Sequence, residues 1–196
     1  MSDWDSLKRE LDLWQAEGRV ATFWWRDDDV AKPTPQLDRL LHLREHFDLP
    51  LSLAVIPANL DAELVNILEH CAILQHGFAH ENFSANGEKK SEFPESRAAE
   101  EVKKAFTQGK ETLARIFTDQ FIPIMVPPWN RIGRSTVQGL AGLGYSALST
   151  FKPRRAAEAA PGLVQINTHL DPIAWKNSRA LVPAQQLIVV RYNHAA

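Results

Sequence analysis

The sequence has little cysteine and no strong excess of either charge. It contains 196 residues with one cysteine, so an internal disulfide is excluded. That residue, Cys71, lies in an apolar run, and we expect a small buried side chain rather than a nucleophile. The formal net charge is -2 without a long run of one sign, which argues against nucleic-acid binding through phosphate neutralisation.

Long apolar segments are also missing. No stretch approaches the roughly 18 apolar residues of a membrane-spanning helix, so we expect no membrane partner. Residues 1–5 carry no basic region followed by an apolar core, which predicts no export signal and a cytoplasmic location. The sequence contains no internal repeat, linker or low-complexity segment. We therefore expect a single domain over residues 1–196, and the sequence does not indicate an oligomeric state.

Apolar periodicity predicts an alternation of strands and helices. Strands are expected over residues 20–25, 51–56, 71–74, 121–126, 145–150, 163–168 and 187–191. Helices are expected over residues 4–17, 33–47, 61–70, 95–117 and 135–143, with a polar loop over 81–94. This alternation predicts an α/β fold with a largely parallel sheet. The pattern alone fits a closed barrel or an open, doubly wound sheet.

Polar segments follow four of the predicted strands. They are Asp27–Asp29, His76–His80, Pro127–Arg131 and His169–Asp171. Parallel strands bring their carboxyl ends to one face, where the sites of barrels and open sheets lie. We therefore expect the four segments to meet in a single cleft.

The two histidines of the second segment are the best candidates for metal ligands. His76 and His80 are four residues apart, just past a predicted strand, and Gly77 between them gives the backbone freedom to bend. Together with one carboxylate they would form a three-ligand, zinc-type set with a position open for water. The spacing alone is weak evidence, because His42 and His46 have the same spacing on a predicted helix, where we expect a structural role.

The aspartate triplet allows two interpretations. Three adjacent carboxylates are tolerated in a solvated turn or a helix cap. Beside the apolar Trp24 and Trp25, clustered negative charge needs a compensating cation. A turn could then aim one carboxylate at a metal and leave its neighbour free as a base.

The last two segments also have a functional and a structural interpretation. Pro127 and Pro128 stiffen a loop, which could present the Trp129 ring and a backbone N–H to a substrate, or simply end the strand. Asp171 could orient His169 as a general acid, or the segment could be a capped loop.

Taken together, the four segments resemble the polysaccharide deacetylase family, family four of the carbohydrate esterases. Residues 26–29 look like the counterpart of its first motif, an aspartate pair after strand one. Residues 76–80 match its His-x-x-x-His motif, and residues 126–129 resemble its proline-containing third motif. His169 is the candidate for its later histidine. The resemblance implies an α/β fold, a distorted (β/α)7 barrel.

The resemblance also implies residue roles and an activity. Asp28, His76 and His80 would bind a divalent metal, and zinc is the expected ion. Asp27 would be the base and His169 the acid. Asp28 as base with Asp29 as ligand is the other register. The implied activity is removal of an acetyl or similar acyl group from an N-acetylated sugar or related amide. The further catalytic and substrate-binding candidates are Arg131, Pro128, Trp129, Asn130 and Asp171.

The sequence departs from the family pattern at two positions. Val126 stands where the third motif usually begins with an arginine that steadies the catalytic aspartate, and Arg26 or Arg131 are possible replacements. Asp29 stands where a glycine usually follows the aspartate pair. Two alternative functions therefore stay open: a metal-dependent amidase acting on a small non-sugar amide, and an inactive binding module of the same fold.

Overall fold

The computed structural model describes residues 3–175 and 179–188, and it divides the chain into two compact units. Unit 1 holds the described parts of residues 1–23, 151–153 and 168–196, and unit 2 holds residues 24–150 and 154–167. The expectation of a single domain stays a prediction. None of the described helices is long and apolar enough to cross a membrane.

Unit 2 contains all the named strands. These are β1 (Trp25–Val30), β2 (Leu51–Val55), β3 (Ala72–His76), β4 (Phe121–Val126), β5 (Ala147–Leu148), β6 (Glu158–Ala160) and β7 (Leu163–Gln165). Its α-helices are α2 (Pro35–His46), α3 (Leu64–Ile67), α4 (Ala99–Phe117) and α5 (Arg134–Leu140). Its short 3₁₀ turns are η1 (Pro57–Asn59), η2 (Thr118–Gln120), η3 (Pro128–Asn130) and η4 (Ala141–Leu143).

Unit 1 contains two helices and two isolated bridges between short segments. The helices are α1 (Asp3–Ala16) and α6 (Ala184–Ile188), which contact each other. Phe151 pairs with Thr168, and Ile173 pairs with Leu181.

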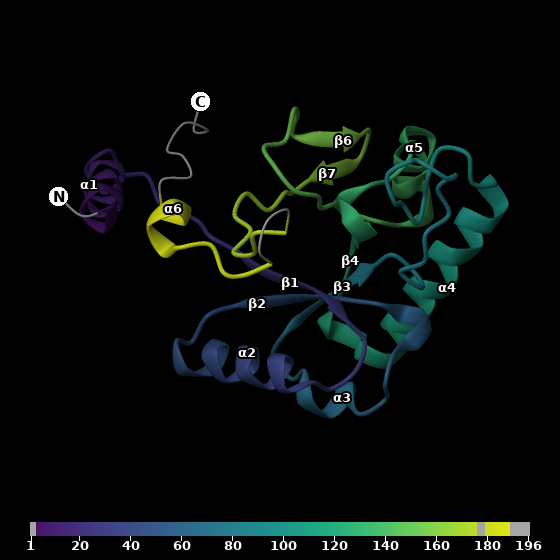
Figure 1. Ribbon diagram of the computed structural model, residues 1–196, viewed down its shortest axis with the longest axis horizontal. Helices are drawn as coiled ribbons and strands as arrows, with labels where there is room; N and C mark the ends of the chain where they lie inside the picture. Colours follow the sequence, from purple (N-terminus) through teal and green to yellow (C-terminus); the bar gives the residue numbers. More distant parts are fainter. Residues whose placement is uncertain (1–2, 176–178, 189–196) are drawn as a thin grey trace. The chain divides into compact units, whose positions relative to one another are not determined.

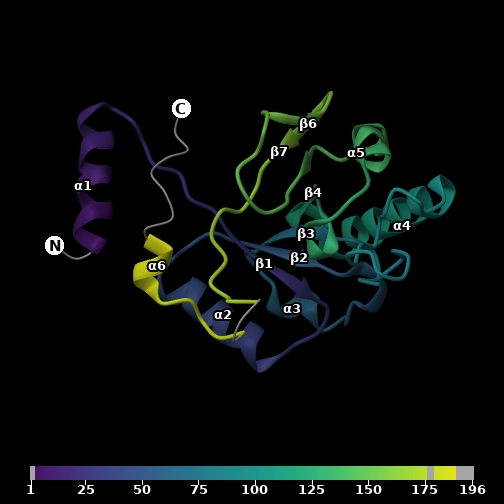
Figure 2. The same cartoon turned by 45° about the horizontal axis from the view of Figure 1, so that its top comes forward.

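The strands of unit 2 form one sheet of seven strands in the order β1-β2-β3-β4-β5-β7-β6. All neighbours pair in parallel except β6 and β7, which form an antiparallel hairpin. Figures 1 and 2 show the strands side by side with helices packed against them. The α/β fold with a mostly parallel sheet is therefore confirmed. Among the described residues, no pairing joins the end strands β1 and β6.

Alternating side chains of the central strands point into separate cores on the two faces of the sheet. Helices α2, α3 and α4 pack on one face, where Leu53 and Ile73 contribute to the core (Figure 1). Their neighbours in the strands, Ala54 and Leu74, belong to a smaller core that also holds Val126. The polar residues at the carboxyl ends of the strands therefore start from rigid, buried positions.

The first strand lies five residues later than expected. The sequence predicted a strand over residues 20–25, but β1 begins at Trp25, and Val20 and Phe23 are largely exposed. Aspartates are rare in strands, and the sequence therefore indicates a turn for the triplet. In the structure, the three aspartates form part of β1. β1 lies at one end of the described strand order, so one of its edges pairs within the sheet. Charged residues are common in such edge strands.

The end of the chain also differs from the prediction. Leu187 and Ile188 lie in α6 rather than in a strand, and the rest of the predicted strand over 187–191 lies outside the described residues. The seventh strand is instead β6, which the short sequence Glu-Ala-Ala did not suggest. The Pro161-Gly162 pair that turns β6 into β7 was the local signal for this hairpin.

A buried polar network joins α4 to β3 and to Tyr145, two residues before β5. The Tyr145 hydroxyl donates to Gln75 Oε1 at 2.6 Å, and Gln75 Nε2 donates to the Gly77 carbonyl at 2.9 Å. Gln75 is fully buried and lies against Gly109 of α4, where a Cβ would overlap its amide nitrogen. Gly109 is thus required for the close approach of Gln75 to the helix.

We predict opposite effects for two helical Gly→Ala substitutions. Gly109→Ala should destabilise the fold by about 1–3 kcal/mol, because the new methyl displaces Gln75 from its buried hydrogen bonds. Gly139→Ala in α5, where a Cβ meets no neighbouring atom, should stabilise it by about 0.5–1 kcal/mol. Urea unfolding measures the change in the free energy of unfolding for both variants. A change of the same sign in both would contradict the packing role of Gly109.

Candidate metal centre

Three side chains converge on one point: Asp29 from β1, His76 from the end of β3 and His80 from the loop after β3. Asp29 Oδ1 lies 2.9 Å from His76 Nε2 and 3.1 Å from His80 Nε2. His76 is 3% exposed, His80 25% and Asp29 63%, so the cluster has a buried floor and an open side. Among the described residues, it is the one group of three His, Cys, Asp or Glu donors close enough to share an ion.

Local backbone geometry aims these side chains. His76 ends β3, and its Nδ1 lies 2.9 Å from the Val126 carbonyl of β4, which directs Nε2 into the cluster. Gly77 and His80 have φ angles of 59° and 57°, so the chain curls back after the strand. Asp29 has a φ of 67° at an irregularity in the β1–β2 pairing, which turns its carboxylate out of the regular strand alternation.

The three donors fit a divalent ion such as zinc. Ligand bonds of about 2.0–2.1 Å reach one ion only when the donor atoms lie roughly 4 Å apart or closer, and the two measured Asp29 contacts satisfy this limit. Two imidazoles and a carboxylate are a common donor set for zinc and leave a position for water. The hydrogen bond with His76 lowers the pKa of Asp29, which keeps this ligand ionised.

Asp28 belongs to a separate interaction. Its two carboxylate oxygens accept hydrogen bonds from Arg26 Nε at 2.7 Å and Nη2 at 3.0 Å, a two-point ion pair. The Arg26 side chain is 3% exposed, donates a further bond to the Ser149 hydroxyl, and lies 5.8 Å from the centre of the Trp24 ring. Asp28 itself is 32% exposed. The arginine holds this carboxylate in a fixed orientation, one residue before Asp29 in β1.

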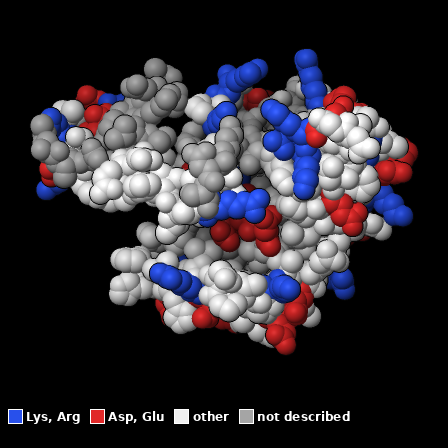
Figure 3. Space-filling view, viewed as in Figure 1, with Lys and Arg blue, Asp and Glu red and all other residues white. Residues whose placement is uncertain are grey.

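Asp27 is the third carboxylate, and it faces a cavity. The cavity has a volume of about 380 Å³, and Asp27, Asp28, Asp29, Lys32 and Thr34 contribute to its lining. Figure 3 shows an acidic patch near the middle of the viewed face. Partial withdrawal from water, and then the charges of Asp28 and Asp29, raise the pKa of Asp27 to about 6.

The structure favours Asp29 as the carboxylate closest to the two histidines. The first register made Asp28 the metal ligand and Asp27 the base, but the carboxylate beside His76 and His80 is that of Asp29. Asp28 lies on the same face of β1 as Arg26, two residues away, and pairs with it. The metal-ligand and base roles of the three aspartates stay predictions, and the geometry favours Asp29 over Asp28 as the candidate ligand.

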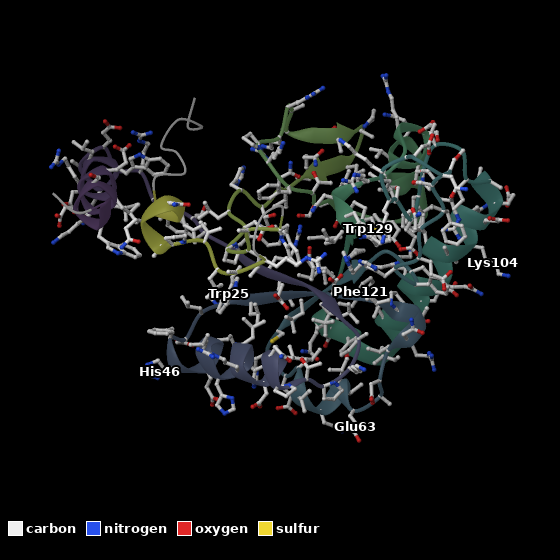
Figure 4. The ribbon with its side chains drawn as sticks, in the orientation of Figure 1. Trp25, His46, Glu63, Lys104, Phe121 and Trp129 are labelled. Atoms are coloured by element: carbon white, nitrogen blue, oxygen red, sulfur yellow. The ribbon has the colours of Figure 1, made fainter. Side chains whose placement is uncertain are left out.

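The proline-rich segment lies beside the cluster. Pro128 is buried and starts η3, which also holds Trp129 (labelled in Figure 4). The Trp129 ring lies 4.4 Å from that of His80. Asn130 is exposed and, like Trp129, has a φ of 56°. Arg131 donates to the Lys90 carbonyl at 2.9 Å, while the arginine that pairs with an aspartate is Arg26. The substrate-binding roles of Pro128, Trp129 and Asn130 and the catalytic role of Arg131 stay predictions.

His169 and Asp171 lie in unit 1. The Asp171 oxygens accept hydrogen bonds from the Ile173 N–H at 2.9 Å and from Trp175 Nε1 at 2.7 Å. These local hydrogen bonds are compatible with the capped loop that the sequence allowed as an alternative. His169 is exposed, and its role as an acid stays a prediction, as does the binding of substrate by Asp171.

Two important side chains were not identified as site residues from the sequence. Arg26 was considered only as a possible replacement for the missing arginine, although its spacing of two from Asp28 would place both on one strand face. Glu92, in the loop before α4, accepts hydrogen bonds from the backbone of residues 78–80. Nothing near Glu92 in the sequence distinguishes it from the other acidic residues of that loop.

Comparison with solved structures identifies the fold. The deacetylase domain of BpsB from Bordetella bronchiseptica superposes with a TM-score of 0.54 and 14% identity, covering 82% of this chain and 76% of that chain. The Streptococcus pyogenes deacetylase PplD, in complex with acetate, gives 0.53 and 17% identity, covering 81% of this chain and 70% of that one. A proposed polysaccharide deacetylase from Mycobacterium smegmatis gives 0.50 and 22% identity over 68% of this chain.

The comparisons confirm the predicted resemblance at the level of the fold. The present chain has the fold of these deacetylases and spans 45% of the length of the Mycobacterium protein. No family model and no curated protein matches the sequence.

We predict that zinc binding distinguishes Asp29 from Asp28. Asp29→Asn should weaken zinc binding by about 100-fold or more, because it removes a charged ligand, whereas Asp28→Asn should change it less than about threefold. Isothermal titration of the metal-free proteins with zinc measures both constants. A larger loss in Asp28→Asn than in Asp29→Asn would restore the first register.

Proposed function

We propose that this protein is a metal-dependent hydrolase that removes an acetyl or similar acyl group from an N-acetylated sugar or a related amide. The observation that carries this proposal is the Asp29, His76 and His80 cluster, with the Arg26-bound Asp28 beside it, in a chain with a deacetylase fold. Neither feature alone selects an activity. Together they supply an ion site and a fixed, partly exposed carboxylate at the same place.

Asp29, His76 and His80 would hold the metal, with zinc the best match to the donor set. When bound, the metal would supply a Lewis acid and lower the pKa of a water molecule. The Val126 carbonyl fixes the His76 ring so that Nε2 is the nitrogen offered to the ion.

Asp28 is the proposed general base. Its carboxylate accepts a proton from the attacking water, and the two hydrogen bonds from Arg26 keep it oriented toward that proton. Arg26 thereby takes the role of the arginine that the third motif of this chain lacks. This pair also favours an active enzyme over an inactive binding module, because the main support for the inactive module was the missing arginine.

The segment after β4 is the proposed wall of the substrate site. Pro127 and Pro128 have no N–H, and the N–H groups of Asn130 and Arg131 donate to carbonyls of the same turn. The N–H of Trp129 is therefore the candidate donor to the oxygen of the acyl group as negative charge develops on it. The Trp129 ring, beside His80, would contact the substrate.

His169 is the proposed general acid. It would donate a proton to the leaving nitrogen as the carbon–nitrogen bond breaks, so that acetate and an amine leave. This role rests on the family resemblance, and a His169→Ala variant that keeps full activity would remove it from the mechanism.

We predict that metal and activity are lost together. The unmutated protein should contain about one zinc per chain and release acetate from N-acetylated sugars, whereas His76→Ala should lose both, because a ligand with its fixed tautomer is gone. Metal analysis and acetate release are measured on the same samples, with simple amides as competing substrates. Unchanged zinc content in His76→Ala would contradict the assignment, and turnover restricted to simple amides would favour the small-amide alternative.

Arg26→Met should separate catalysis from metal binding. Removing the guanidinium leaves Asp28 without its two-point partner, so kcat should fall by about 10- to 100-fold while zinc affinity changes less than about threefold. Steady-state kinetics and zinc titration of the folded variant are the two measurements. An unaltered kcat would show that Asp28 does not depend on Arg26.

A further inference from the structure

The loop that carries His80 is held by a single buried carboxylate. Glu92 Oε1 accepts hydrogen bonds from the N–H of Phe78 at 3.1 Å and of Ala79 at 2.8 Å, and Glu92 Oε2 accepts one from the N–H of His80 at 3.3 Å. Glu92 is 1% exposed. Three consecutive backbone donors thus surround one anion, the geometry of an anion-binding backbone nest.

The neighbouring residues make this arrangement close-fitting. A Cβ on Gly77 would overlap Glu92 Oε2 and the ring of Pro128, so the carboxylate occupies space that only glycine leaves open. On the other side of the loop, the Gly77 carbonyl accepts from Gln75 Nε2, and the Phe78 carbonyl accepts from the Ala58 N–H at 2.9 Å. The backbone between the two histidines is therefore fixed from both sides.

Glu92 is itself anchored to the segment that follows β4. The Ser91 hydroxyl donates to the Arg131 carbonyl at 3.1 Å, and the Gly133 N–H donates to the Phe93 carbonyl at 2.7 Å. Arg97 donates to the Glu92 carbonyl at 2.9 Å. The carboxylate is attached to a rigid part of the unit rather than to a mobile loop tip.

We propose that Glu92 is a positioning residue for the metal centre: its carboxylate fixes the backbone of His80 and so holds the second imidazole ready for the ion. This inference rests on the metal site proposed above. His76 belongs to β3 and is fixed by the sheet, but His80 lies four residues beyond the strand and has a strained φ of 57°. Without the carboxylate, three half-buried N–H groups lose their acceptor, and the ion must itself order the loop, which lowers its affinity.

The test compares two glutamates of one loop. Glu92→Gln keeps the size of the side chain but loses the charge, and we expect zinc to bind about 10- to 100-fold more weakly. Glu95→Gln is the matched control, because Glu95 is an exposed carboxylate that accepts a backbone N–H bond from Ser135 away from the cluster. Zinc titration of both folded variants should show a loss in Glu92→Gln alone. Equal affinities in Glu92→Gln and the unmutated protein would overturn the inference.

A second measurement needs no variant. In the metal-free, unmutated protein, the amides of residues 78–80 should exchange with deuterium as slowly as those of β3, although they lie in a loop. Fast exchange of these three amides would overturn the inference even if Glu92→Gln fails to fold. If zinc does not bind the unmutated protein, both the proposed function and this inference fail. If zinc binds the unmutated protein and Glu92→Gln equally well, only this inference fails.

Discussion

Three neighbouring carboxylates repel one another, and the site depends on how each of these charges is compensated. Asp28 is paired with the buried Arg26, and Asp29 contacts two imidazoles. Asp27 has neither partner type, and its raised pKa means that it carries less of the negative charge near neutral pH than a free aspartate would. The irregular pairing of β1 is what allows consecutive residues to reach these different surroundings.

The parts of the fold that the sequence predicted well are those where burial produces a continuous apolar run. β2, β3 and β4 lie within two residues of the predicted strands, since both faces of these strands are covered. The prediction placed the first strand too early because residues 25–30 are acidic, and acidic residues do not favour strands. These residues can pair as β1 because the strand lies at one end of the sheet. The terminal strand was misassigned because a short apolar run fits a helix as well as a strand.

The site was predictable to the extent that it depends on spacing along the chain. His76 and His80 were found from their separation and from Gly77, and their partner was expected in the triplet. The aspartate that contacts the two histidines is Asp29, because the backbone at this residue is irregular and has a positive φ. The sequence alone does not predict this irregularity. Glu92 depends on contacts between parts of the chain 12 to 14 residues apart, and no local pattern marks it.

The position of the triplet at one end of the sheet has a consequence for solubility. An edge strand exposes a row of backbone donors and acceptors that can template the addition of a strand from another molecule. Charged side chains along such an edge make that addition costly, and Asp27 and Asp29 are both exposed on β1. The carboxylates of the triplet would therefore also disfavour intermolecular β-pairing along β1.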